Sequence, residues 1–145
     1  MKVAVVLVLA LILGLAGCSR EAAPPSAVVS PPETKLPAGC RELSPNEAEA
    51  FMMAKPDLVI LDMRVESEWV EEGHLPGAER TNFYREALKD HLAAMDRSKS
   101  YLVYCAIGER SKQTAVQMAE LGFKEISILS GGLNAWKAAG KPVAK

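Results

Sequence analysis

The sequence is short of three features, and each shortage argues against a class of function. No block of like charge stands out among its 145 residues, and the formal net charge is only −1. A nucleic-acid-binding domain needs a basic face, so the composition argues against a nucleic-acid partner. The three cysteines include no Cys-x-x-Cys pair, which weakens a thioredoxin-like or zinc-binding interpretation. There is no internal repeat, and the length allows one folded domain.

The longest apolar run lies at the amino terminus. Lys2 precedes the uninterrupted apolar residues 3–13, and small residues follow, which is the pattern of a secretory signal peptide over residues 1–17. The run is too short to be a comfortable transmembrane helix. Its end, Leu15 to Cys18 (LAGC), resembles the lipobox of bacterial lipoproteins. This resemblance implies cleavage before Cys18 and lipid attachment to that cysteine; the alternative is a plain signal peptide with an incidental cysteine.

The anchor and the segment after it predict a location in the bacterial cell envelope. Ser19, rather than aspartate, follows Cys18, so we expect the periplasmic face of the outer membrane if the cell has two membranes. Residues 18–39 hold five prolines among Ala, Ser and Glu and almost no large apolar residue. Such a segment buries too little surface to offset its ordering entropy, and proline keeps it extended. We therefore expect a lipid-anchored tether, and a folded domain over residues 40–145.

Two cysteines remain in the folded domain, Cys40 and Cys105. An exported protein enters an oxidising compartment in which disulfides persist, so a bridge between them is possible by count alone. We do not expect it, because Cys40 opens the domain on what is predicted to be an edge strand. A permanent bridge would also disable the strongest candidate nucleophile.

Apolar runs alternate with amphipathic segments through the whole domain. The predicted strands are residues 40–43, 58–61, 78–81, 101–104 and 126–129. The predicted helices are residues 44–54, 67–72, 85–95, 111–121 and 133–139. This alternation predicts an α/β fold in which a parallel sheet carries helices on both faces. Ligands of such folds lie at the carboxyl ends of the strands, which is where Cys105 falls.

The segment from Cys105 to Arg110, here called the cysteine loop, joins a buried strand to a helix amino terminus. Backbone N–H groups of a tight loop and the helix dipole both attract an anion. These surroundings, with the positive charge of Arg110, favour a reactive thiolate and an anionic substrate. The alternative is a buried structural thiol, since free cysteine is among the most buried residue types.

Three motifs resemble signatures of the rhodanese family. The first comprises Leu61–Arg64 (LDMR), Glu68-Trp69 and Gly73–Ala78 (GHLPGA). The second is Tyr104-Cys105 through Arg110-Ser111, and the third is Ser130–Trp136 (SGGLNAW). They stand in the family's order and span about residues 40–143. The sequence is therefore identified as resembling a single-domain rhodanese.

The resemblance implies a sulfurtransferase that needs no cofactor and no metal. In that family the loop cysteine, here Cys105, takes the outer sulfur of a small anionic donor such as thiosulfate as a persulfide. The sulfur then passes to a thiol or to cyanide. Two alternatives remain open: a non-catalytic rhodanese-like binding module, and an envelope persulfide or thiol relay protein. Inactive members typically lose the cysteine, which argues against the binding module.

The resemblance also assigns roles around the nucleophile. The amides of Ala106, Ile107, Gly108, Glu109, Arg110 and Ser111 are expected to hold the persulfide anion. Arg110 is expected to bind the anionic donor through its fork of donors. Related phosphatases and arsenate reductases use a loop one residue longer, so a six-residue loop suits a sulfur atom better than a phosphate. Glu109 faces either solvent or the pocket, and the second orientation would disfavour small anions.

Several other side chains are expected to be structural. Asp62, Arg64 and Glu68 follow an apolar strand, and we expect Arg64 and Glu68 to pair and hold the turn beside the site. His74 is expected to be a turn residue rather than a general base. Trp136 is expected in the core, and Trp69 in the core or at the pocket rim.

Overall fold

The computed structural model describes residues 35–145. The predicted signal peptide, Cys18 and the tether up to residue 34 therefore lie outside the described residues. Among residues 35–145, no helix combines the length and the apolar character needed to cross a membrane.

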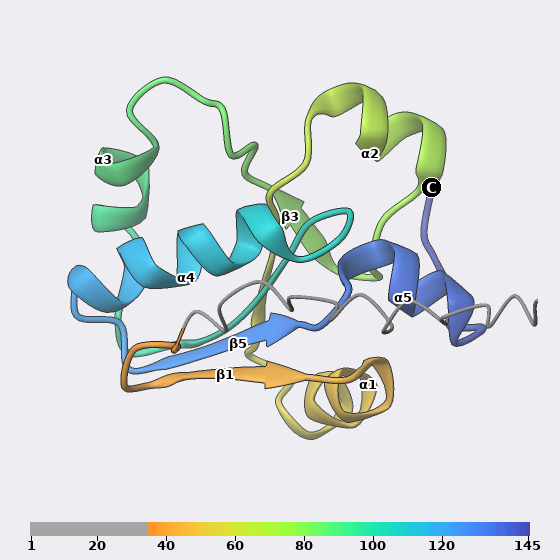
Figure 1. Ribbon diagram of the computed structural model, residues 1–145, viewed down its shortest axis with the longest axis horizontal. Coiled ribbons are helices and arrows are strands. Elements are labelled where there is room, and N and C mark those ends of the chain that lie inside the picture. The colour runs from red at the N-terminus through yellow and green to blue at the C-terminus, as the bar shows by residue number, and fades with distance from the viewer. Residues whose placement is uncertain (1–34) are drawn as a thin grey trace, which may run out of the picture. The chain divides into compact units, whose positions relative to one another are not determined.

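The domain is built on one parallel sheet of five strands (Figure 1). The strands are β1 (Cys40–Leu43), β2 (Val59–Asp62), β3 (Ala78–Arg80), β4 (Ser100–Tyr104) and β5 (Glu125–Leu129). Their order across the sheet is β1-β5-β4-β2-β3, and every paired neighbour runs parallel. All carboxyl ends therefore meet at one edge of the sheet, with β4 in its centre. The predicted α/β class is confirmed.

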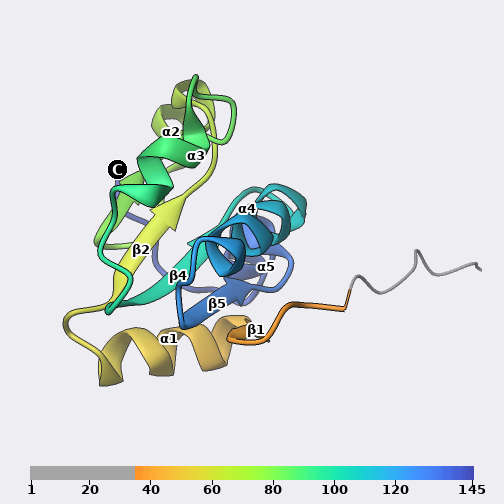
Figure 2. The same cartoon turned by 90° about the vertical axis from the view of Figure 1, so that its left-hand side faces the viewer.

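Alternate side chains of the strands feed two separate cores. In β4, Tyr101 and Val103 pack with α3 (Leu88–Ala93) and α4 (Glu109–Glu120). Leu102 and Tyr104 pack with α1 (Pro45–Ala54) and α5 (Gly132–Ala138) on the opposite face. Figure 2 shows α4 and α1 on opposite sides of β4 and β5. Cover on both faces explains why the inner strands β2, β4 and β5 are mostly apolar, whereas the edge strands β1 and β3 carry charged residues.

The predicted helix starts and stops are confirmed where local chemistry decides them. Ser44 caps α1: its backbone N–H donates to Glu47 Oε2 at 2.8 Å, and its hydroxyl accepts from the Glu47 N–H at 3.4 Å. These reciprocal bonds form a capping box, which satisfies two amides at the helix start. The short helix α2 (Glu66–Glu72) ends at Gly73, as expected.

Two predicted helices have the wrong bounds. The helix predicted over residues 85–95 spans only Leu88–Ala93, and it begins late because Ala87 takes a left-handed φ of 54° that is incompatible with a helix. The helix predicted to begin at Ser111 begins at Glu109, immediately after Gly108. Glu109 and Arg110 therefore belong to the first turn of α4 and not to a free loop.

Candidate active site

Cys105 directly follows β4 and is buried at the carboxyl edge of the sheet. Its Sγ accepts a hydrogen bond from the backbone N–H of Gly108 at 3.1 Å. The hydroxyl of Ser111 lies 3.8 Å from the same sulfur and donates to the carbonyl of Gly108 at 2.7 Å. The sulfur thus faces the start of α4, where free amides and the helix dipole favour negative charge. The arrangement suits a thiolate or a persulfide anion.

Gly108 makes this contact possible. Its φ of 105° lies in the region that favours glycine, and it caps the start of α4. Of the amides predicted to hold the anion, that of Gly108 donates to Sγ.

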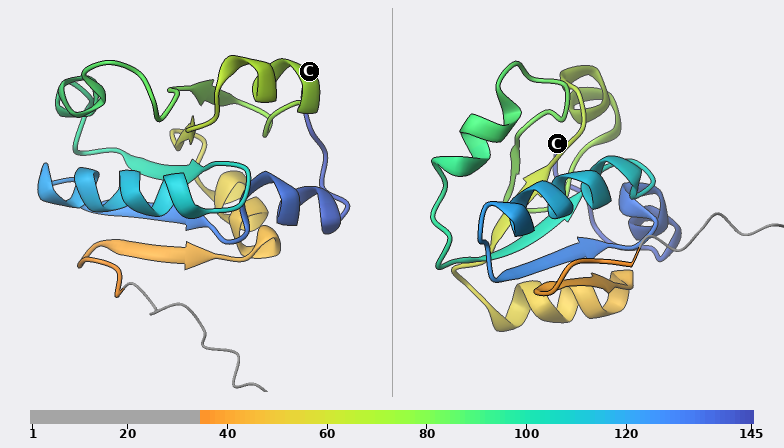
Figure 3. Two further views of the ribbon diagram at one scale, coloured as in Figure 1. Left: turned by 45° about the horizontal axis from the view of Figure 1, so that its top comes forward. Right: turned by 60° about the vertical axis from the view of Figure 1, so that its left-hand side comes forward.

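The start of α5 lies beside the cysteine loop (Figure 3). The backbone N–H of Leu133 donates to the carbonyl of Cys105 at 2.8 Å, and that of Asn134 donates to the carbonyl of Ala106 at 3.1 Å. A Cβ on Gly132 would collide with both of these carbonyl oxygens. Sequence reasoning missed this role. The available signal was a glycine pair directly before a helix, where unpaired amides need acceptors.

Arg110 is bound by Glu68 of α2. Its two terminal nitrogens donate to the two carboxylate oxygens at 2.8 and 2.7 Å. Glu68 Oε2 also accepts the backbone N–H of Val65 at 3.0 Å. The hydrogen bonds that Arg110 donates to Glu68 lower the pKa of Glu68 and raise the pKa of Arg110. This bidentate ion pair, here called the rim pair, joins α4 to α2 beside the sulfur.

The predicted pairing of Arg64 with the Glu68 carboxylate is wrong. Arg64 is fully buried, and its Nε and Nη2 bind the carboxylate of Asp62, the closest contact being 2.8 Å. It also donates to the backbone carbonyls of Glu68 at 3.1 Å and Gly73 at 2.7 Å. The helical turn of α2 directs the Glu68 carbonyl toward Arg64 while its side chain reaches α4. We call Arg64 and Asp62 the buried pair, and its contacts are those of a structural clamp.

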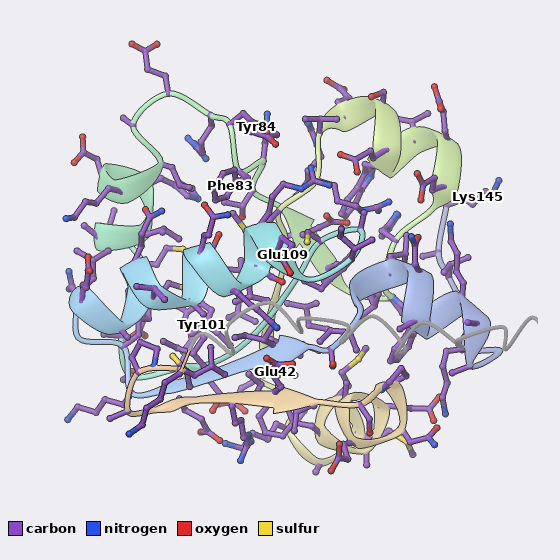
Figure 4. All side chains as sticks on the ribbon, viewed as in Figure 1. Glu42, Phe83, Tyr84, Tyr101, Glu109 and Lys145 are labelled. Atoms are coloured by element: carbon purple, nitrogen blue, oxygen red, sulfur yellow. The ribbon has the colours of Figure 1, made fainter. Side chains whose placement is uncertain are left out.

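The remaining predicted residues divide between surface and core. Glu109 is exposed at the start of α4, so it faces solvent (Figure 4). Ile107 is 60% exposed within the loop. His74 exchanges backbone hydrogen bonds with Ala144. Its ring stacks on Trp69 at 3.8 Å, the contacts of a turn residue. Trp136 is buried, as expected.

Sequence reasoning also missed Tyr84. Its ring lies 5.9 Å from the Arg110 guanidinium carbon, and 68% of the residue is exposed. Figure 4 shows Phe83 and Tyr84 on the segment beside the start of α4. Nothing in the local sequence distinguishes this tyrosine, because its neighbour Arg110 is distant along the chain.

Cys40 lies far from the nucleophile, and both cysteines are free. Cys40 and Tyr101 both pair with Ile126 in the sheet register, so Cys40 is level with a residue four positions before Cys105. Four strand residues span about 13 Å, whereas a disulfide needs Cα atoms within about 7 Å. Burial raises the pKa of the Cys40 thiol. Cys40 borders a shallow hollow with Arg41, Lys124 and Glu125, away from the cysteine loop.

Comparison with known proteins gives a consistent result. The family model described as "Rhodanese-like domain" matches residues 44–139. The chain is 36% identical over 87 residues to the thiosulfate sulfurtransferase GlpE of Coxiella burnetii, covering 60% of this chain and 78% of that protein. It is 29% identical over 97 residues to the GlpE of Stutzerimonas stutzeri, covering 67% and 84%. The solution structure of the rhodanese-like domain of Alr3790 from Anabaena superposes with a TM-score of 0.61 at 30% identity, covering 71% and 77%.

Proposed function

The chain belongs to the rhodanese-like domain family, and from this premise we propose that it is a sulfurtransferase acting through a persulfide on Cys105. The donor is thiosulfate or a related sulfane-sulfur compound, and the acceptor is a thiol or cyanide. The observation that carries this proposal is the position of the Cys105 sulfur. It lies at the carboxyl edge of the sheet, 3.1 Å from the Gly108 amide and against the start of α4.

The reaction has two halves. In the first, the Cys105 thiolate attacks the outer sulfur of the donor, and the donor's sulfur–sulfur bond breaks. With thiosulfate, the electron pair leaves on sulfite. In the second, the acceptor attacks the outer sulfur of the persulfide and Cys105 returns as a thiolate. A covalent intermediate of this kind predicts ping-pong kinetics.

The chain's own groups supply electrostatic support for both halves. The Gly108 N–H donates to the sulfur, and the dipole of α4 favours the negative charge that the sulfur carries before and after transfer. The bonds from α5 to the carbonyls of Cys105 and Ala106 keep the loop in one conformation. The geometry is thus prepared before the donor binds, which reduces the reorganisation needed in the transition state.

Replacing the nucleophile tests the proposal. Cys105→Ser should lower sulfur transfer at least about a thousandfold, because a serine hydroxyl is not ionised at neutral pH and cannot carry a persulfide. Cys40→Ser is the matched control and should retain activity within about twofold, since Cys40 lies outside the site. Thiocyanate formation from thiosulfate and cyanide measures both variants. Activity retained by Cys105→Ser would remove the proposal.

We also propose that Cys18 anchors the domain to an envelope membrane through lipid, on the sequence motif alone. The lipid chains that anchor the domain would all be carried by Cys18, and stable anchoring takes more than one chain. A variant without this cysteine should therefore detach from the membrane or remain unprocessed. Fractionation of cells that express Cys18→Ala tests this, with Cys40→Ala as the control. Normal processing and membrane attachment of Cys18→Ala would contradict the lipid anchor.

A further inference from the structure

Arg110, the arginine of the cysteine loop, is already bound within the rim pair. Both terminal nitrogens of Arg110 are bound by both oxygens of Glu68, and the two side chains are only 17% and 23% exposed. A donor anion that used Arg110 would first have to break two charge-assisted hydrogen bonds. It would then lie beside the released carboxylate of Glu68, which repels a second negative charge.

The other charges around the loop do not replace Arg110. Glu109, its neighbour, is exposed to solvent and supplies no positive charge. Lys112, one turn along α4, binds Glu42 of β1 at 2.9 Å. The rim pair itself carries one carboxylate against one guanidinium and so presents no net positive charge. A small dianion such as thiosulfate is therefore not attracted by the charges around the cysteine loop.

The surface around the cysteine loop, here called the mouth of the site, also carries exposed apolar side chains. Within residues 35–145, four large hydrophobic residues are prominently exposed: Met53, Val70, Tyr84 and Ile107. Two of them border the site. Ile107 lies two residues after Cys105 and is 60% exposed, and Tyr84 lies against Arg110 and is 68% exposed. A donor that brings an apolar group to Cys105 can bury these two side chains, which stabilises its complex with the protein, whereas a small anion cannot.

We propose that the sulfur donor of this site is a thiol persulfide on an uncharged, apolar carrier rather than a small inorganic anion. This inference rests on the proposed function. The Cys105 thiolate attacks the terminal sulfur of the persulfide R–S–SH, and a new bond forms to Cys105 as the donor's sulfur–sulfur bond breaks. The electron pair leaves on the carrier as its thiolate, and the proton stays with the transferred sulfur. No oxidant or reductant is consumed, and Ile107 and Tyr84 contact the group R.

The test compares two donors across matched variants. The probes are thiosulfate and the persulfide of N-acetylcysteine methyl ester, and the readout is the rate at which protein mass increases by one sulfur. Comparing each variant with the unaltered protein, donor by donor, removes the difference in intrinsic reactivity between the probes.

Glu68→Gln keeps the acceptor for the Val65 amide and releases the charge of Arg110. It should raise the thiosulfate rate about tenfold and change the persulfide rate less than about twofold, the gain expected from one charge-assisted contact. Glu66→Gln, an exposed carboxylate of the same helix paired with Arg80, is the control and should change neither rate. A Glu68→Gln protein in which thiosulfate gains nothing would overturn the inference.

Ile107→Ser and Tyr84→Ser should each slow the persulfide about fivefold more than they slow thiosulfate, because each removes an apolar contact that the larger donor makes. Met53→Ser, a still more exposed apolar residue that lies on α1, is the control. Equal slowing of both donors by Ile107→Ser would overturn the inference while leaving sulfur transfer intact. If no donor adds sulfur to Cys105 in the unaltered protein, the proposed function itself fails.

A third probe identifies the source of the persulfide. The persulfide of the blocked peptide Leu-Cys-Leu presents the same sulfur on a larger apolar surface. A rate more than about threefold above that of the ester supports a carrier polypeptide, since more apolar surface is buried. A rate within threefold supports a small thiol carrier. A peptide rate below that of thiosulfate, unchanged by Ile107→Ser, would contradict an apolar contact at the mouth.

Discussion

Arg64 and Arg110 each bind a carboxylate through two nitrogens, yet their surroundings differ sharply. The buried pair has no exposed surface, and Arg64 also binds two backbone carbonyls of the α2 segment. The rim pair keeps 17% and 23% of its side chains exposed and joins two helices beside the nucleophile. Similar local chemistry therefore serves two purposes. The buried pair stabilises the α2 segment on the sheet, and the rim pair sets the charge that a substrate meets.

The difference in burial leads to the largest expected effect. Asp62→Ala removes the buried partner of Arg64 and leaves this buried cation with the more distant carboxylate of Glu72 at 3.5 Å, so it should cost about 3 kcal/mol of unfolding free energy. Glu68→Ala removes the corresponding partner at the rim and should cost about 1 kcal/mol. Urea unfolding of the two variants measures both values. Asp62→Asn, which keeps one hydrogen-bond acceptor, should be intermediate and secures the measurement if Asp62→Ala does not fold.

Equal losses of unfolding free energy in Asp62→Ala and Glu68→Ala would contradict the distinction between the buried pair and the rim pair. In that case the rim pair would be a structural clamp like the buried one, and its placement beside Cys105 would carry no special meaning for the substrate.

A pH series sharpens the comparison at the rim. The pKa of Glu68 lies below its ordinary value of 4.5, so its ion pair stabilises the fold fully above that value. The contribution is lost as pH falls through the lowered folded-state pKa. The difference in unfolding free energy between the unaltered protein and Glu68→Gln should therefore be constant from pH 5 to 8 and shrink below about 4. A difference that grew on acidification would contradict the assigned sign.

Arg110→Lys should have a smaller effect on catalysis than a direct anion contact would give. Lysine keeps the charge and can still pair with Glu68, while the two-pronged fork is lost. Because Glu68 already occupies the guanidinium, we expect the kcat/KM for thiosulfate to change less than about threefold. Steady-state kinetics with Arg110→Lys and Lys112→Arg as control measure this. A loss of tenfold or more would restore Arg110 as the anion ligand.

Glu109→Gln should have the smallest effect. Glu109 is exposed at the start of α4, outside the rim pair, and an exposed charge is screened by solvent and salt. We expect the kcat/KM for thiosulfate to stay within about twofold at ordinary salt. A clear rise in this kcat/KM that disappears at high salt would show that the Glu109 carboxylate repels the donor, as the carboxylate of Glu68 does.

The sequence predicted those parts of the molecule that local patterns decide. The helix start at Ser44, the five strands and the placement of Cys105 at the carboxyl edge all follow from periodicity, helix-start signals and strand–helix alternation. Ion-pair partners do not follow from such patterns. Glu68 is four residues from Arg64 but 42 from Arg110, and only the fold brings the more distant arginine to its carboxylate.

The local sequence offered a partial signal for Gly132, the glycine pair before a helix, and none for Tyr84. Gly132 matters because the start of α5 approaches the carbonyls of Cys105 and Ala106, and Tyr84 because the segment after β3 passes over Arg110. Both are contacts between elements that are distant along the chain. The shortening of α3 has a similar origin, since the left-handed backbone of Ala87 is not a local preference of alanine.

The most direct test of the account is to locate the transferred sulfur. The purified protein is treated with a sulfane-sulfur donor, digested, and analysed by mass spectrometry, with and without later addition of a thiol acceptor. We predict one additional sulfur on the peptide that contains Cys105, none on the peptide that contains Cys40, and loss of that sulfur once the acceptor is added. Sulfur found on Cys40, or no sulfur on Cys105 with either thiosulfate or the thiol persulfide, would contradict the account.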